Sequence, residues 1–132
     1  MSLEETRERF IADRFATKVC GITIKEVGPG EALCRMEIKD FHKNALDGVQ
    51  GGAIFTLADF AFAVASNQDG AATVSLSNNI TYLRGSRGAV LYARARRVSS
   101  TRRVAAFEVT ITDDLEQTIA VMTVTGFIRD AK

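Results

Sequence analysis

The segment from Ala53 to Ala65 constrains this chain most, because it has the length of a helix and almost no polar surface. Its sequence is AIFTLADFAFAVA, in which only Thr56 and Asp59 are polar. A helix that is apolar all round has to be covered on every side. The rest of the chain must therefore supply a layer wide enough to wrap around this helix.

Asp59 is the anomaly within this segment. Burying an ionised carboxylate is costly unless partners compensate its charge, and no lysine, arginine or histidine lies within one helical turn of it. The carboxylate is then either a structural group held by distant residues or a group kept for chemistry. Burial alone leaves both interpretations open.

The flanking segments predict the covering layer. Four β-branched segments follow the apolar one, each bounded by a turn signal, and no helical segment separates them. Such connections favour an antiparallel sheet. A two-stranded hairpin around Gly28-Pro29-Gly30 and a short amphipathic N-terminal helix come first. The expected ranges are Leu3–Phe15 for that helix, Val19–Val27 and Ala32–Ile38 for the hairpin, and Thr73–Leu83, Ala89–Val98, Val104–Thr112 and Gln117–Ile128 for the later strands.

These elements predict an α+β fold, in which a curved antiparallel sheet wraps around one long central helix. The helix is expected to begin near Gly51 and to end between Asn67 and Gly70. With 132 residues, 46% of them hydrophobic, the range 1–132 is expected to form a single domain.

Composition excludes several classes of partner. A formal charge of +1 gives no indication of nucleic-acid binding, and no apolar run approaches the roughly 18 residues of a membrane span. Cys20 and Cys34 lie on hairpin segments in positions that would not face each other, so two reduced thiols are expected. These features predict a cytoplasmic protein.

The start of the central helix is expected to attract negative charge. Gly51 and Gly52 leave the backbone accessible there, and the unpaired N–H groups of a helix start favour an anion. In acyl transfer, that anion is the oxyanion that develops on an attacked carbonyl group. Asp59 is then the candidate nucleophile or general base.

One helix cannot bring these groups to a single reacting centre. Asp59 follows Gly51 by eight residues, which is about 12 Å along a helix axis, whereas both groups must lie about 3 Å from the reacting atom. Two antiparallel helices related by a two-fold axis would place the glycines of one chain beside the carboxylate of the other. The spacing therefore predicts a homodimer with two shared sites.

The same residues carry a family resemblance. From His42 to Asp59 the sequence reads H-x-N-x-x-x-G-x-x-G-G-x-x-x-x-L-A-D, and the run NITYLRG follows at residues 79–85. Over about residues 15–129 the chain resembles the hotdog-fold thioesterases of the phenylacetate-degradation (PaaI-like) group. The resemblance implies a hotdog fold, hydrolysis of acyl-CoA thioesters, and sites between two protomers. It implies no metal or redox cofactor, because coenzyme A is part of the substrate.

The resemblance also implies roles for individual residues. Asp59 matches the acidic catalytic residue, and Gly51 matches the backbone N–H that polarises the thioester carbonyl. Asn44 matches a polar residue that places the substrate or the attacking water, and Ser75 matches a hydroxyl position that can orient this water. The residues expected to contact the substrate are Gln50, Gly52, His42, Phe55, Phe62, Ser77, Arg84 and Arg87.

Some of these residues also have ordinary structural interpretations. His42 could be a loop histidine, Asn44 a turn cap and Ser75 a plain strand hydroxyl. Phe55 and Phe62 could belong to the core, to the acyl pocket or to both. Ser77 is included because alternation along a strand predicts that it shares the face of Ser75. Gln50 is a departure, since the family usually has histidine there and an amide cannot take up a proton near neutral pH.

Charge is uneven along the second half of the chain. Seven arginines and no acidic residue lie between Arg84 and Arg103. They form either a solvated strand face or, in part, a site for the phosphates of coenzyme A, with Arg84 and Arg87 as the leading candidates.

The favoured function is hydrolysis of an aromatic or medium-chain acyl-CoA by a homodimer, which can pair again into a dimer of dimers. The alternative is a non-catalytic acyl-CoA-binding or sensing module, which needs the pocket but not the carboxylate. Hydration or dehydration of acyl thioesters ranks low. Hotdog enzymes of that kind commonly rely on a histidine beside an acidic residue, and His42 lies well upstream of the glycine pair.

Overall fold

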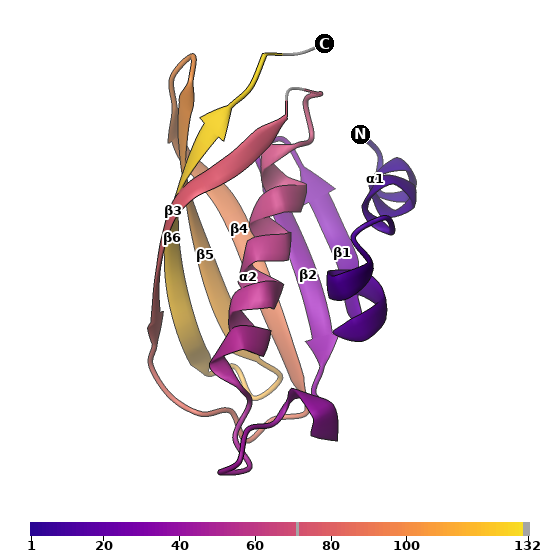
Figure 1. Ribbon diagram of the computed structural model, residues 1–132, viewed down its shortest axis with the longest axis vertical. Helices are drawn as coiled ribbons and strands as arrows, with labels where there is room; N and C mark the ends of the chain where they lie inside the picture. The colour runs from indigo at the N-terminus through magenta and orange to yellow at the C-terminus, as the bar shows by residue number, and fades with distance from the viewer. Residues whose placement is uncertain (71, 131–132) are drawn as a thin grey trace.

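The computed structural model describes residues 1–70 and 72–130. Six antiparallel strands form one curved sheet in the order β1-β2-β4-β5-β6-β3, and a long helix, α2, lies along its concave face (Figure 1). This is the predicted α+β arrangement. The strands are β1 Ile22–Gly28, β2 Glu31–Glu37, β3 Thr73–Tyr82, β4 Val90–Ser100, β5 Val104–Asp113 and β6 Thr118–Ile128.

Helix α2 spans Gly51–Ser66 and packs mainly against β2 and β4. Small side chains on both sides of this contact, such as Ala58 and Ala61 on the helix and Ala93 on β4, are fully buried and allow a close approach. The Asn67 side chain closes the helix: its Nδ2 donates to the Ala63 carbonyl over 2.8 Å, and its Oδ1 accepts the Thr73 N–H over 2.8 Å. The helix end is thereby tied to the start of β3.

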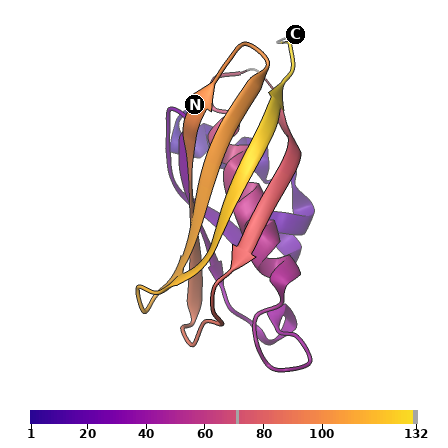
Figure 2. The same cartoon turned by 90° about the vertical axis from the view of Figure 1, so that its left-hand side faces the viewer.

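The expectation that α2 is buried on every side is wrong for one protomer. Positions 52, 55, 56, 59 and 63 form a stripe with three- and four-residue spacing that remains exposed or half-exposed. Figure 2 shows the reason, because the sheet covers α2 from one side only. The stripe holds glycine, phenylalanine, threonine, aspartate and alanine, so a mainly apolar surface stays open.

The N-terminal helix α1 spans Leu3–Phe10 and ends before the predicted Phe15. The break comes from Asp13, whose carboxylate accepts the Ala16 N–H over 3.1 Å. A side-chain acceptor of this kind favours the start of a new helical segment. That segment is η1, a π-helical turn over Phe15–Val19.

The predicted common face of Ser75 and Ser77 is also wrong. Ser75 lies opposite Gly126 and Ser77 opposite Thr125, because a bulge interrupts β3 between the two serines. Residues directly opposite in a sheet share a face, and successive residues of β6 point to opposite faces. Ser75 therefore faces the helix side of the sheet and Ser77 faces the outer side.

Cys20 and Cys34 are both free, as predicted, and both are buried. Their burial matters for chemistry, because it raises the pKa of the Cys34 thiol to about 12. It also raises the pKa of Cys20, with a further contribution from the negative charge of Asp13. Since the thiolate is the nucleophilic form, neither cysteine competes with Asp59 as a nucleophile near neutral pH.

Within residues 1–70 and 72–130, no helix has the length and apolar character to cross a membrane.

Candidate active site

The first turn of α2 presents unpaired backbone donors. Gln50 precedes the helix in an extended conformation, with φ −64° and ψ 136°, and its side chain makes no capping hydrogen bond. Within the described part of the chain, the Gly51 and Gly52 N–H groups donate no hydrogen bond to a protein atom. The first two N–H groups of the helix are therefore free to bind a ligand oxygen.

Tyr82, at the end of β3, holds this turn in place. Its hydroxyl donates a hydrogen bond of 2.9 Å to the Gly51 carbonyl. The ring lies so close that a Cβ on residue 51 would be only 3.2 Å from the ring carbon Cζ. The contact explains why glycine suits position 51 and links the sequence run NITYLRG to the start of the helix.

The loop before the helix is folded by Asn44 and His42. The Asn44 carboxamide oxygen accepts the N–H groups of Leu46 and Gly48 over 2.9 and 3.1 Å, which closes a tight turn. The His42 ring is buried and uses both nitrogens: Nδ1 accepts the Lys39 N–H over 2.9 Å, and Nε2 donates to the Cys20 carbonyl over 2.8 Å. These bonds require the neutral ring with its proton on Nε2.

The structural interpretation of both residues thus has direct support, while their substrate contacts stay predictions. The His42 ring also borders a pocket, so a contact with substrate through the ring face is compatible with its two backbone bonds. A role in proton transfer is not compatible with these two bonds, because neither ring nitrogen is free.

Two pockets flank the first turn of α2. The first, of about 360 Å³, lies between the helix and η1 and is lined by Gln50, Gly52 and Thr56 together with the ring of His42. The second, of about 370 Å³, lies on the β3 side and is lined by Gly51, Tyr82 and Arg84. The loop that carries Arg84 thus meets the helix start. Arg87 is exposed farther along this loop and does not line the pocket.

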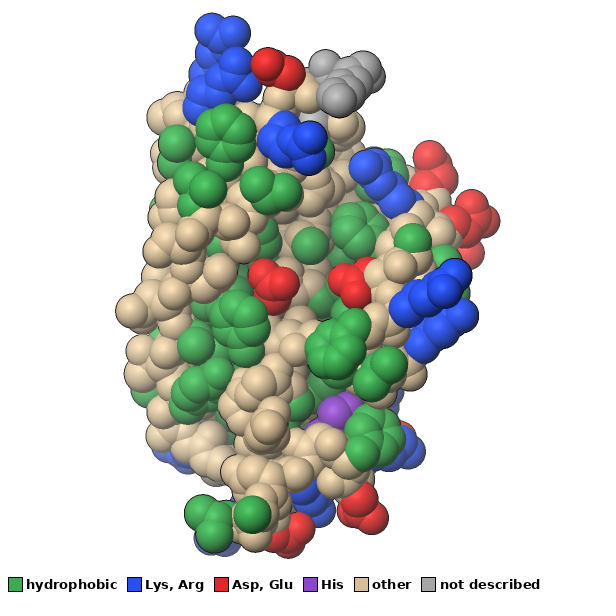
Figure 3. All heavy atoms as spheres, viewed as in Figure 1, with side chains coloured by type: hydrophobic (Ala, Val, Ile, Leu, Met, Phe, Trp, Pro, Cys, Tyr) green, Lys and Arg blue, Asp and Glu red, His purple; other side chains and the backbone are tan. Residues whose placement is uncertain are grey.

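Asp59 lies two turns farther along α2, half-buried in the open stripe. Burial raises the pKa of its carboxyl group above the ordinary range, and the negative charge of Asp13 raises it further. Figure 3 shows acidic side chains near the middle of this face with hydrophobic side chains around them. Asp59 lines neither of the two pockets described above, so one protomer leaves the carboxylate apart from the helix start, as the helix rise predicts.

The two predicted phenylalanines differ in their surroundings. Phe55 is half-exposed in the open stripe, where a substrate can reach it. Phe62 is only 2% exposed and packs edge-on against Phe107, with ring centroids 5.3 Å apart. Phe62 therefore belongs to the core of the single protomer, and Phe55 is the stronger candidate for contact with an acyl group.

Sequence reasoning missed two polar residues on the helix side of β3. The sequence indicates Tyr82 only as part of the NITYLRG run, because its contact with Gly51 joins residues 31 positions apart. Asn78 faces inward because the bulge shifts the alternation, and its Oδ1 is the one buried side-chain oxygen without a partner among the described residues. Strand alternation alone would not have found it, since the bulge has no clear sequence signal.

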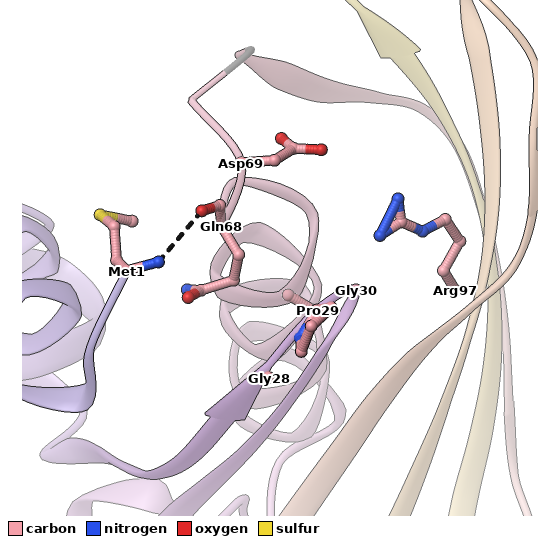
Figure 4. A pocket seen from close by; sticks show the side chains of 8 residues that line it. Met1, Gly28, Pro29, Gly30, Gln68, Asp69 and Arg97 are labelled. Atoms are coloured by element: carbon pink, nitrogen blue, oxygen red, sulfur yellow. Dashed lines mark hydrogen bonds between the residues drawn. The ribbon is translucent and has the colours of Figure 1, made fainter.

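A third hollow, of about 290 Å³, lies at the other end of α2 (Figure 4). It is lined by Gly30, Gln68 and Arg97 together with Met1, whose amino group donates to the Gln68 carbonyl over 3.2 Å. None of the residues with a predicted catalytic or binding role lines it. The candidate site is therefore at the start of α2.

Comparison with known proteins identifies the family of this chain. The profile of the thioesterase superfamily matches residues 49–120, a range that includes both Gly51 and Asp59. A protein of Archaeoglobus fulgidus is 35% identical over 98 residues, which are 74% of this chain and 64% of that protein. The chain thus spans less than two thirds of the length of this relative.

Two further relatives are informative about chemistry. The acyl-coenzyme A thioesterase PaaI of Escherichia coli is 32% identical over 104 residues, which are 78% of this chain and 74% of PaaI. A Streptococcus mutans protein solved with bound acetyl-CoA superimposes with a TM-score of 0.79 at 28% identity, over 84% of this chain and 90% of that chain. With the family match covering more than half of its residues, the chain belongs to the thioesterase superfamily and has its hotdog fold.

Proposed function

We propose that this protein is an acyl-CoA thioesterase that acts on an aromatic or medium-chain acyl group. The observation that carries the proposal is the half-buried carboxylate of Asp59, which has no cationic partner in hydrogen-bond or ion-pair range among the described residues. A buried charge without compensation is expensive for stability and is typical of catalytic sites. Family membership and the similarity to PaaI support the reaction class.

The proposed chemistry uses the first N–H of α2 and the Asp59 carboxylate two turns farther along the helix. The Gly51 N–H binds the thioester oxygen and stabilises the negative charge that develops on it. Asp59 either attacks the carbonyl carbon, giving an anhydride that water then hydrolyses, or removes a proton from a water that attacks directly. In both routes the carbon–sulfur bond breaks, the thiol of coenzyme A leaves, and the acyl group is released as a carboxylate.

A second copy of the chain completes this site. The open stripe of α2 supports the proposal, because it is largely apolar and holds Asp59 at a distance from the helix start. The edge strand β3 offers a further unpaired surface with Val74 and Leu76 exposed. Two antiparallel α2 helices would cover both stripes and place Gly51 of one copy beside Asp59 of the other.

Arg84 and Arg87 are proposed to bind the phosphates of coenzyme A. Arg84 is the better placed of the two, since it borders the pocket that contains Gly51 and Tyr82. Gln50 lies over the Gly52 backbone, where a Cβ on residue 52 would be 2.7 Å from the Gln50 Oε1. This amide can contact the substrate by hydrogen bonds without any change of protonation.

We expect the purified protein to release free coenzyme A from a panel of acyl-CoA thioesters, measured with a thiol reagent. Aromatic and medium-chain substrates should give the highest kcat/KM. Binding of acyl-CoA with no thiol release across the whole panel would instead support the non-catalytic binding module.

We expect a homodimer at assay concentrations, because a monomer would leave the apolar stripe in water and the site incomplete. Sedimentation velocity with parallel activity measurements over a dilution series checks this. Activity should fall as the dimer dissociates. A monomer with full specific activity would contradict the shared site, whereas a tetramer would show that the dimers pair again.

A further inference from the structure

The bond between Tyr82 and Gly51 joins the end of β3 to the turn that carries the proposed oxyanion donor. Tyr82 is 47% exposed, so its hydroxyl could have been satisfied by water. It is instead directed at a backbone carbonyl in the first turn of α2, over 2.9 Å. Because the Tyr82 side chain is exposed, core packing by itself does not explain this contact.

The acceptor of this bond belongs to a particular peptide unit. The Gly51 carbonyl and the Gly52 N–H are the two ends of one planar amide. A hydrogen bond at the carbonyl fixes the orientation of this plane and polarises the amide, which makes its N–H a stronger donor. The Gly52 N–H is one of the two free donors at the start of α2.

Apart from the backbone hydrogen bonds of the helix, few contacts restrain this turn. Glycine has more conformational freedom than any other residue, and the Gln50 side chain contributes no cap. The side-chain contacts of the Gly51–Gly52 peptide are therefore the Gln50 amide beside Gly52 and, on the other side, the Tyr82 ring beside Gly51. Of the two, only Tyr82 makes a hydrogen bond to this peptide.

We propose that Tyr82 is a positioning residue for the oxyanion site, and that it orients and polarises the Gly51–Gly52 peptide so that the Gly52 N–H acts as a second donor beside the Gly51 N–H. This inference rests on the proposed thioesterase function. Two N–H donors from successive peptides, held before the substrate arrives, stabilise a developing oxyanion more than one donor does, because no reorganisation is needed during the reaction.

The test is Tyr82→Phe, which removes the hydroxyl and keeps the ring that lines the pocket. We expect kcat to fall about 3- to 10-fold, the effect of one hydrogen bond, with KM changed less than twofold because the pocket wall is retained. The matched control is Tyr92→Phe, since Tyr92 is the only other tyrosine and lies on β4. It should leave both constants unchanged.

A spectroscopic measurement separates this role from a general structural one. In ¹H–¹⁵N spectra of the unliganded protein, Tyr82→Phe should move the Gly52 amide proton upfield, because its peptide loses the polarising hydrogen bond. The resonances of the sheet core should not move. The melting temperature should stay close to that of the wild type, since an exposed hydrogen bond contributes little to folding.

Each outcome either supports or overturns the positioning role of Tyr82. A reduced kcat with unchanged KM and a shifted Gly52 amide supports the positioning role. An unchanged kcat in an active enzyme, or a kcat loss that parallels a drop in melting temperature, overturns it. If the wild type hydrolyses no acyl-CoA, the proposed function itself fails, and the role of Tyr82 in it fails too. Activity of the wild type thus distinguishes failure of the proposed thioesterase function from failure of the proposed role of Tyr82.

Discussion

Asp59→Asn is expected to reduce kcat by about 10³-fold or more, the range for loss of a general base or nucleophile. The same change should stabilise the unliganded protein, because it removes a half-buried charge that has no cationic partner. An increase of about 3 °C in the melting temperature corresponds to about 1 kcal/mol for a chain of this size. Thiol release and thermal unfolding of the same sample measure both effects.

The pH dependence of activity and of stability follows from the raised pKa of Asp59. Activity needs the ionised form, so kcat should fall on the acid side with a midpoint above the ordinary aspartate value of about 3.9. Stability has the opposite dependence on pH. The folded protein holds this proton more tightly than the unfolded chain, so the contribution of Asp59 to stability is lost as pH rises through the raised pKa.

Asp13→Asn is the matched control for this prediction. Asparagine keeps an oxygen that can accept the Ala16 N–H, so η1 should be retained. Removing the Asp13 charge should shift the acid limb of kcat to lower pH, because that charge raises the pKa of Asp59. Full activity of Asp59→Asn, or an acid limb at the ordinary aspartate value, would contradict the proposed role. Incorporation of labelled oxygen from water into Asp59 during one turnover distinguishes direct attack from general base catalysis.

Gly51→Pro is expected to lower kcat by about 10²- to 10³-fold, because proline has no N–H to donate to the oxyanion. The helix should tolerate proline at this first position. Gln50 already has the extended conformation that a following proline requires, with φ −64° and ψ 136°. Gly51→Ala is the control, since alanine places the same Cβ against Tyr82 and keeps the N–H. The difference in kcat between the two variants isolates the hydrogen bond.

Mixing the two inactive variants tests the shared site. A heterodimer of Asp59→Asn with Gly51→Pro has one site in which both groups are intact and one site that lacks both. Random exchange of equal amounts should restore about a quarter of the wild-type activity, since half of the dimers are mixed and each has one working site. No recovery after confirmed subunit exchange would contradict a site built from Gly51 and Asp59 of different chains.

Local sequence signals predicted much of the fold. The hairpin and the four later strands occur close to the expected positions, because β-branched segments and turn residues act over a few residues. The start of α2 at Gly51 was also predicted. The end of α1 was not, because the Asp13 side chain competes there with continuation of the helix.

The sequence by itself determined that an isolated carboxylate lies in an apolar helix and that it is about 12 Å from the glycines, because the rise of a helix per residue is constant. Only the tertiary structure decided which side of α2 stays open, which face each serine of β3 occupies, and that Tyr82 holds Gly51. These features depend on contacts between segments far apart in the chain, and on a bulge that changes strand alternation without changing composition.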